Sequence, residues 1–188
     1  MEREINLSKK FIVGFWGKFI PLQGVPYIIE AAKILEFDSD INFELIGDGQ
    51  TYQESISLAK KLGLTNICFA GQVPFIEMPL RIKKYDLCLG IFGETEKTLR
   101  VIPNKIYEAI ACVKPVITAN TPAIKELFYD QNNILLCQRA NAKDLAEKII
   151  LLKNNHDLRK TIASGGYKLY HQFCRPVVIA EKLIKDLF

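Results

Sequence analysis

The sequence predicts an α/β fold with a doubly wound, parallel, six-stranded sheet and helices on both faces. Six short apolar runs alternate with segments of helical periodicity from end to end, which is the pattern of parallel strands joined by helical crossovers. The runs are mostly apolar, as expected of strands buried on both faces.

Each strand is predicted from an apolar run that ends at a glycine or a polar turn. The six predicted strands are residues 11–16, 41–46, 67–70, 86–92, 115–119 and 134–137. Helical periodicity fills the segments between them. The predicted helices are residues 24–37, 50–62, 74–85 (interrupted by Pro79), 103–113, 122–128, one starting at Asn141 to Asp144, 156–172, and one opening at Pro176.

Composition and length indicate one globular domain, residues 1–188. The net charge of +4 and the lack of a basic block argue against nucleic acid. No apolar run reaches the roughly 18–20 residues that span a bilayer, and residues 1–6 lack a signal-peptide core. The five cysteines are not closely spaced, so we expect buried free thiols in a reducing cytoplasm and no metal site: Cys68, Cys88, Cys112, Cys137 and Cys174.

The helix predicted over 103–113 carries the clearest functional signal. Pro103 suits a first helical position, and a core-facing stripe recurs at helical spacing: Ile106, Ala109, Ile110 and Val113. Asn104, Lys105 and Glu108 lie off that stripe, with side chains tilted toward the helix opening. That opening attracts anions, so a lysine for phosphate and a glutamate for a hydroxyl pair predict a nucleotide-sugar site.

Three loops at predicted strand ends could contribute, because ligands of such sheets bind there. Gly17 allows close backbone approach and Lys18 can neutralise phosphate, although a tight turn with a solvated lysine explains both. The sequence Gly47-Asp48-Gly49 lacks the third glycine of a dinucleotide fingerprint, so we interpret it as a turn before a helix. The segment Gly90 to Thr95 is either a backbone cradle near a sugar or a flexible loop.

Other candidates leave two interpretations open. Lys105 and Glu108 could form a surface pair at i, i+3, but their place at a helix opening favours function. Arg100 could fold over phosphate. His156 and His171 fall in the C-terminal helices, away from the predicted crevice, and no Ser-His-Asp set or metal cluster is visible.

Four stretches together give the chain a resemblance to the C-terminal, donor-binding domain of the retaining GT-B glycosyltransferases (glycosyl transferases group 1). They cover about residues 10–150: Gly17-Lys18 through Gln23-Gly24, Leu45 to Gly49, Phe69 to Val73, and Pro103 through Glu108 to Ile117. The resemblance implies a Rossmann-like half of a GT-B fold. It also leads us to expect an acceptor-binding N-terminal domain that these 188 residues lack.

The resemblance also implies roles for individual residues. Gly17 and Lys18 would meet the diphosphate, Gln72 and Val73 would border the base, Glu108 would hold the ribose, and residues 92–95 would approach the sugar. The expected donor-binding residues are Gly17, Lys18, Gln72, Val73, Phe92, Gly93, Glu94, Arg100, Asn104, Lys105 and Glu108. No metal or other cofactor is implied, since lysine, arginine and the helix opening could stabilise the leaving diphosphate. No catalytic residue is assigned.

The chain departs from the family pattern at two positions. Gln23 stands where the family usually has a lysine, which weakens one phosphate contact. Arg100 stands at the first of two glutamate positions, so Glu94 or backbone groups would contact the sugar instead. Lys105, in the Pro-Asn-Lys form of some branches, offers an alternative phosphate ligand.

The leading hypothesis is therefore the donor half of a cytoplasmic glycosyltransferase. It would move a hexose from a nucleotide diphosphate sugar to an unknown acceptor, and would be inactive without an acceptor-binding domain or subunit. Peripheral membrane association through that other half is left open. The alternatives are a non-catalytic nucleotide-sugar binding or interaction module and, more weakly, a nucleotide-sugar epimerase.

Overall fold

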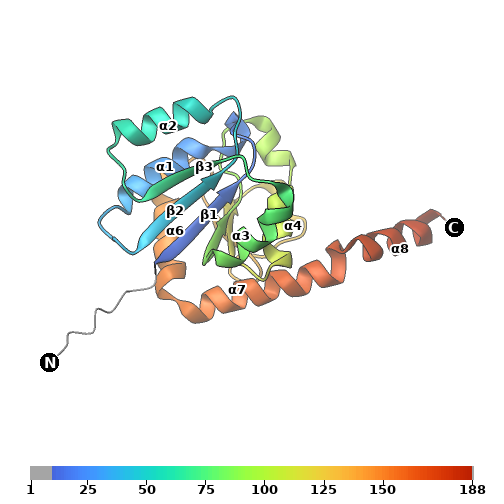
Figure 1. The fold of residues 1–188 in the computed structure, drawn as a ribbon. Coiled ribbons are helices and arrows are strands. Elements are labelled where there is room, and N and C mark those ends of the chain that lie inside the picture. The colour runs from blue at the N-terminus through green and yellow to red at the C-terminus, as the bar shows by residue number, and fades with distance from the viewer. Residues whose placement is uncertain (1–9, 188) are drawn as a thin grey trace.

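The computed structural model describes residues 10–187, which form one six-stranded parallel sheet, as predicted (Figure 1). The spatial order is β3-β2-β1-β4-β5-β6, so the order reverses between β1 and β4. The strands are β1 (Phe11–Trp16), β2 (Ile41–Ile46), β3 (Ile67–Gly71), β4 (Leu87–Leu89), β5 (Val116–Ala119) and β6 (Leu135–Cys137). The first two strands coincide with their predicted ranges.

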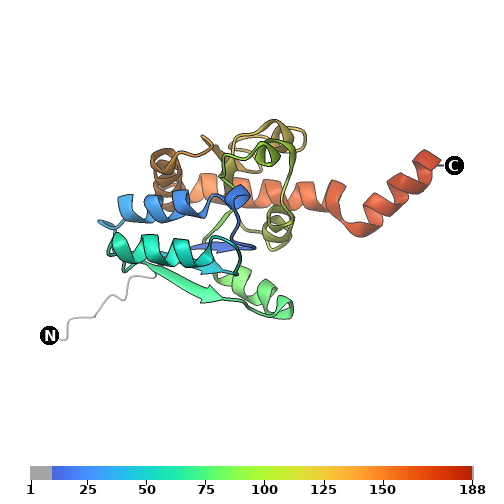
Figure 2. The same ribbon diagram turned by 90° about the horizontal axis from the view of Figure 1, so that it is seen from above.

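Helices cover both faces of the sheet, as the doubly wound prediction requires. They are α1 (Val25–Ile34), α2 (Tyr52–Lys61), α3 (Met78–Lys84), α4 (Asn104–Ala111), α5 (Pro122–Lys125), α6 (Ala142–Asn154), α7 (His156–Leu169) and α8 (Pro176–Leu187). One apolar core includes residues of α1 and α6, and a second includes residues of α3 and α4. Figures 1 and 2 show α8 extending away from the rest of the molecule.

The helix that carried the functional signal is shorter than predicted. Pro103 is its N-cap with extended backbone (φ −73°, ψ 145°), and α4 begins one residue later. Ile106, Ala109 and Ile110 are fully buried, as the stripe predicts. Val113 is not part of that stripe: it lies beyond the helix end with φ +58° and is 46% exposed. The N–H of Lys114 instead donates to the carbonyl of Ala109, which closes the last turn.

Two further elements differ from their predicted ranges. Residues 74–85 form a 3₁₀ turn (Phe75–Glu77) followed by α3, whose first turn holds Pro79. The strand predicted over 86–92 is only β4, because Phe92 and Gly93 donate hydrogen bonds to Gln23 and Leu22 and so leave the sheet ladder. The other helix and strand boundaries fall within one helical turn of the predicted ones.

The cysteines are all free thiols, but only two are fully buried. Cys88 lies in the central strand β4, whereas Cys137 in β6 and Cys68 in β3 lie in the two edge strands, where Cys137 is buried and Cys68 is exposed. Among residues 10–187, no helix combines the length and the apolar character needed to cross a bilayer. The expectation about a signal peptide concerns residues 1–6, which lie outside the described residues.

Candidate functional site

A cavity of about 740 Å3 lies beyond the carboxyl ends of β1, β2 and β3. Four of the residues predicted for donor binding line it: Gly17, Lys18, Gln72 and Val73. They come from two loops, and Lys18 and Gln72 are 54 positions apart in the sequence. Parallel strands place both loops at the same edge of the sheet, which is where ligands of such sheets bind.

Close backbone contacts fix the loops around this cavity. The N–H of Gly17 donates to the carbonyl of Ile46 over 3.0 Å, and that of Gly47 to the carbonyl of Gly71 over 2.7 Å. Gly47 has φ +130°, and a Cβ there would lie 1.9 Å from the carbonyl oxygen of Gly17. Only glycine fits this crossing of two loops, so the turn predicted for Gly47 also sets the wall of the cavity.

The charged side chains at the cavity differ in exposure. Lys18 is exposed, so it can reach an anion in the cavity. Asp48 lies on the opposite loop, and its Oδ2 is 3.5 Å from Nε2 of Gln72. The cavity thus has a positively charged side at Lys18 and a polar side at Gln72 and Asp48.

Lys105 does not project into solvent, although the helical pattern placed it on the polar side of α4. It is only 6% exposed, and its Nζ donates to Gln23 Oε1 over 2.6 Å. The same Nζ lies 3.7 Å from the centre of the Phe15 ring and 3.1 Å from where a Cβ of Gly17 would be. Removal of the amine from water lowers the pKa of Lys105 well below its usual range, and Glu108 offsets this in part.

The contact between Lys105 and Gln23 bears on one departure from the family pattern. Gln23 stands at the usual lysine position, and Lys105 brings an amine to that same place from a residue 82 positions away. The sequence named both residues, but their proximity depends on how α4 packs against β1. The structure therefore places an amine near the first loop, although the residue at the usual lysine position is Gln23.

Glu108 lies beside this cavity and is partly exposed. Its Oε2 accepts a 2.6 Å hydrogen bond from the indole Nε1 of Trp16, the last residue of β1. Glu108 also lines a smaller cavity of about 280 Å3, which shares Phe75 and Met78 with the larger one. Sequence reasoning missed Trp16, because a tryptophan that ends an apolar run looks like a core residue; its place directly before Gly17 was the available signal.

The remaining predicted residues do not line the cavity beyond β1, β2 and β3. Phe92 is 1% exposed and its side chain belongs to the core, so only its backbone faces the loops. Gly93 packs against the backbone of the first loop, since a Cβ there would lie 2.1 Å from the carbonyl oxygen of Pro21. Glu94 and Arg100 are exposed on the following segment, where Arg100 pairs with Glu96 over 3.6 Å. Asn104 lines a separate cavity beside α8.

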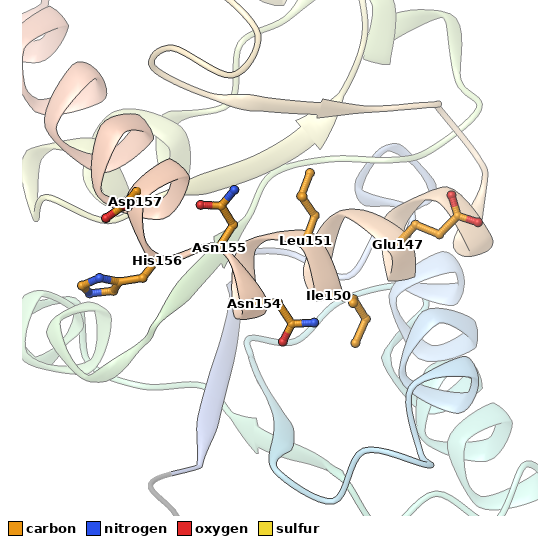
Figure 3. A pocket seen from close by; sticks show the side chains of 7 residues that line it. All are labelled: Glu147, Ile150, Leu151, Asn154, Asn155, His156 and Asp157. Atoms are coloured by element: carbon orange, nitrogen blue, oxygen red, sulfur yellow. The ribbon is translucent and has the colours of Figure 1, made fainter.

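A further cavity lies at the junction of α6 and α7 and contains His156. Its side chains point in different directions and do not converge on one point (Figure 3). The other histidine, His171, is exposed and contacts the ring of Tyr167. Neither histidine lines the cavity beyond β1, β2 and β3, as the sequence predicts.

Comparison with known proteins identifies the family. The family model for glycosyl transferases group 1 matches residues 1–169. The chain belongs to this family. An uncharacterized glycosyltransferase of Methanocaldococcus jannaschii is 35% identical over 159 residues, which cover 85% of this chain and 43% of that protein. The chain thus spans less than half the length of the curated relatives it matches.

Solved structures show the same fold. HepE of Anabaena, in complex with UDP and glucose, superposes with a TM-score of 0.84 at 22% identity and covers 97% of this chain and 49% of that one. The C-terminal domain of LpcC, a glycosyl transferase group 1 family protein of Francisella tularensis, has a TM-score of 0.77 at 24% identity and covers 88% and 87% of the two chains. This glycosyltransferase domain therefore has the Rossmann-like fold of GT-B enzymes, as the resemblance implied.

Proposed function

We propose that this domain binds the donor of a retaining glycosyltransferase, which transfers a hexose from a nucleotide diphosphate sugar to an acceptor. The observation that carries the proposal is the convergence of Gly17, Lys18, Lys105 and Glu108 at the carboxyl end of β1. HepE of Anabaena, which shares the fold, is in complex with UDP and glucose, and this supports the choice of ligand class.

Each group at the site has a chemical role in the proposal. The backbone of Gly17 and the amine of Lys18 hold the diphosphate. Lys105, whose amine lies against Gly17, adds a second cation when it is protonated. These groups stabilise the negative charge that develops on the diphosphate when its bond to the anomeric carbon breaks. A hydroxyl oxygen of the acceptor forms the new bond to that carbon, and the hydroxyl proton passes to the departing diphosphate. We further propose that a second domain, in a longer chain or a separate one, holds the acceptor.

Calorimetric titration of the purified chain with UDP, GDP and ADP tests donor binding. At least one of them should bind, and Lys105→Ala should weaken binding by about tenfold or more, because it removes a charge-assisted contact. His171→Ala, at an exposed residue outside the cavity, is the control and should leave affinity unchanged. No heat from any of the three nucleotides at millimolar concentration, or equal effects of the two variants, would contradict the proposal.

Arg100 motivates a second candidate, a non-catalytic nucleotide-sugar binding module. It is exposed, pairs with Glu96 and stands where the resembling family has a glutamate. Nucleotide binding with no sugar transfer, even after an acceptor-binding domain is supplied, would favour this candidate over the enzyme.

A further inference from the structure

We infer that Trp16 is a positioning residue for donor recognition: its indole N–H fixes the carboxylate of Glu108 in the orientation that recognises the ribose. This inference rests on the proposed function, together with the role that the family resemblance implies for Glu108, which is to accept the ribose hydroxyls. It goes beyond that function because it assigns the selection of ribose over deoxyribose to a residue that does not itself need to touch the ribose.

The contact between the two side chains is short and well placed. Trp16 Nε1 donates to Glu108 Oε2 over 2.6 Å across 92 residues of sequence. Trp16, which directly precedes Gly17 in the sequence, is 6% exposed and lines the cavity beyond β1, β2 and β3, while Glu108 remains partly exposed. An indole donor bonded to a carboxylate is charge-assisted, so it restrains a side chain that would otherwise rotate freely.

The indole ring is itself held from behind. It stacks on the ring of Tyr85 with centroids 6.3 Å apart and an angle of 26°. Tyr85 is 1% exposed, and its hydroxyl donates to Glu44, which Arg81 contacts over 2.8 Å. Burial raises the pKa of Tyr85, so this hydroxyl stays protonated and remains a donor.

The backbone of β1 makes room for this support. A Cβ at Gly14 would lie 2.1 Å from Cδ2 of Tyr85, so the ring packs directly on the glycine. Residues of β1, β2 and α3 thus fix the position of Trp16 before any ligand arrives. A carboxylate oriented in advance loses less conformational freedom on binding, which favours affinity and selectivity.

The two oxygens of the Glu108 carboxylate have different partners, which explains why loss of the Trp16 hydrogen bond would affect the ribose contact. Within the described residues, Trp16 is the hydrogen-bond donor to Glu108 and occupies Oε2. Oε1 and the second lone pair of Oε2 are left for the ribose hydroxyls. If Glu108 rotates, the ribose contact weakens, whereas the contacts of the diphosphate with Gly17 and Lys18 persist. A positioning role therefore changes the ratio of affinities for two sugars and leaves the diphosphate contribution in place.

The test compares a ribonucleotide with its 2′-deoxy form by calorimetry, using UDP and 2′-deoxy-UDP, or the corresponding GDP or ADP pair if that base binds. The natural protein should prefer the ribonucleotide by about tenfold or more, as expected for a hydrogen bond to a charged group. Trp16→Phe should reduce this preference to less than about threefold, while the 2′-deoxy nucleotide binds almost as before. Glu108→Gln serves as the positive control, since it weakens the ribose contact directly.

A second substitution separates the hydrogen bond from the packing. Trp16 is the only tryptophan in the chain. Its replacement by 3-benzothienylalanine exchanges the N–H for sulfur at nearly constant shape, so folding is preserved and the donor is lost. The preference for ribose should fall as in Trp16→Phe. The matched control is protein prepared by the same replacement procedure with tryptophan itself at position 16.

The outcomes distinguish the two proposals. An unchanged ribose preference in variants that still bind, or an equal loss for both nucleotides, would make Trp16 merely structural and overturn the inference alone. Failure of the natural protein to bind any of the nucleotides would overturn the proposed function and this inference with it.

Discussion

Lys105 shows how a single residue can combine a stability cost with a binding role. Its amine is buried against Phe15, and its hydrogen-bond acceptor is the neutral amide of Gln23. Burial of a charged amine beside a neutral partner is unfavourable, which is why the pKa of Lys105 is lowered. A diphosphate bound at Gly17 would supply the missing negative charge and favour the protonated amine.

This arrangement predicts a pH dependence of stability in the nucleotide-free protein. The pKa of Lys105 lies below its ordinary value of 10.5 in the folded protein and returns to that value on unfolding. Between the two values the side chain of Lys105 binds more protons in the unfolded chain, so the contribution of Lys105 to the free energy of unfolding should become more favourable as the pH rises through this window. Below the folded pKa both states bind the proton, so the pH dependence from this residue ends there.

Chemical denaturation of the natural protein and of Lys105→Met between pH 7 and 10.5 checks this prediction. The free energy of unfolding of the natural protein should rise with pH relative to that of the variant, because methionine does not titrate. Parallel curves for the two proteins would contradict the burial of a titrating amine at this position.

The residues of the site differ in how far the sequence could predict them. Gly17, Lys18, Gln72 and Val73 follow apolar runs, and such positions meet at one edge of a parallel sheet. Lys105 was predicted as a phosphate ligand, but its burial was not, since helical periodicity shows only which side chains are polar. The bond of Trp16 to Glu108 depends on tertiary packing across 92 residues, which no local pattern contains.

At the scale of elements, α4 ends in a way that local pattern could not reveal. The apolar stripe continues to Val113, yet this β-branched residue adopts φ +58° after the last turn. An apolar run located β1 at its observed bounds, because burial on both faces leaves a clear signal, and β2 was located although Asn42 and Glu44 interrupt its apolar residues. Helix ends instead depend on capping hydrogen bonds, such as that from Lys114 to Ala109.

The left-handed conformation of Val113 predicts a stabilising substitution. Val113→Gly should raise the free energy of unfolding by about 1 kcal/mol, because glycine adopts this conformation without the steric penalty of a Cβ. The side chain is 46% exposed, so little burial is lost. Thermal unfolding should shift upward by about 2–4 °C. Val113→Ala retains a Cβ and is the control; a gain of the same size in that variant would point to a different cause.

At the scale of the whole molecule, the proposed function gives the domain half of what sugar transfer requires. The chain spans less than half the length of its curated relatives, and its cavity contains groups suited to the donor. Alignment of an acceptor hydroxyl with the anomeric carbon can supply about 7–11 kcal/mol of the barrier. A domain that holds only the donor cannot provide that alignment.

We therefore expect residues 1–188 alone to bind a nucleotide and to transfer no sugar. Transfer should appear when an acceptor-binding domain is supplied, fused or in trans, and product formation from a radiolabelled nucleotide-sugar would measure it. The Glu108→Gln variant in the same fused protein should have reduced turnover. Robust transfer by the isolated chain would refute this division of labour between two domains.

The single tryptophan of the chain gives the protein a built-in optical reporter. Its indole forms part of the cavity wall, is almost shielded from water and touches the carboxylate of Glu108. Indole emission depends on polarity and on nearby charge, so arrival of a nucleotide should change both its intensity and its wavelength. Because no second tryptophan adds a background signal, unlabelled protein can report ligand binding in real time and allow its rate constants to be measured.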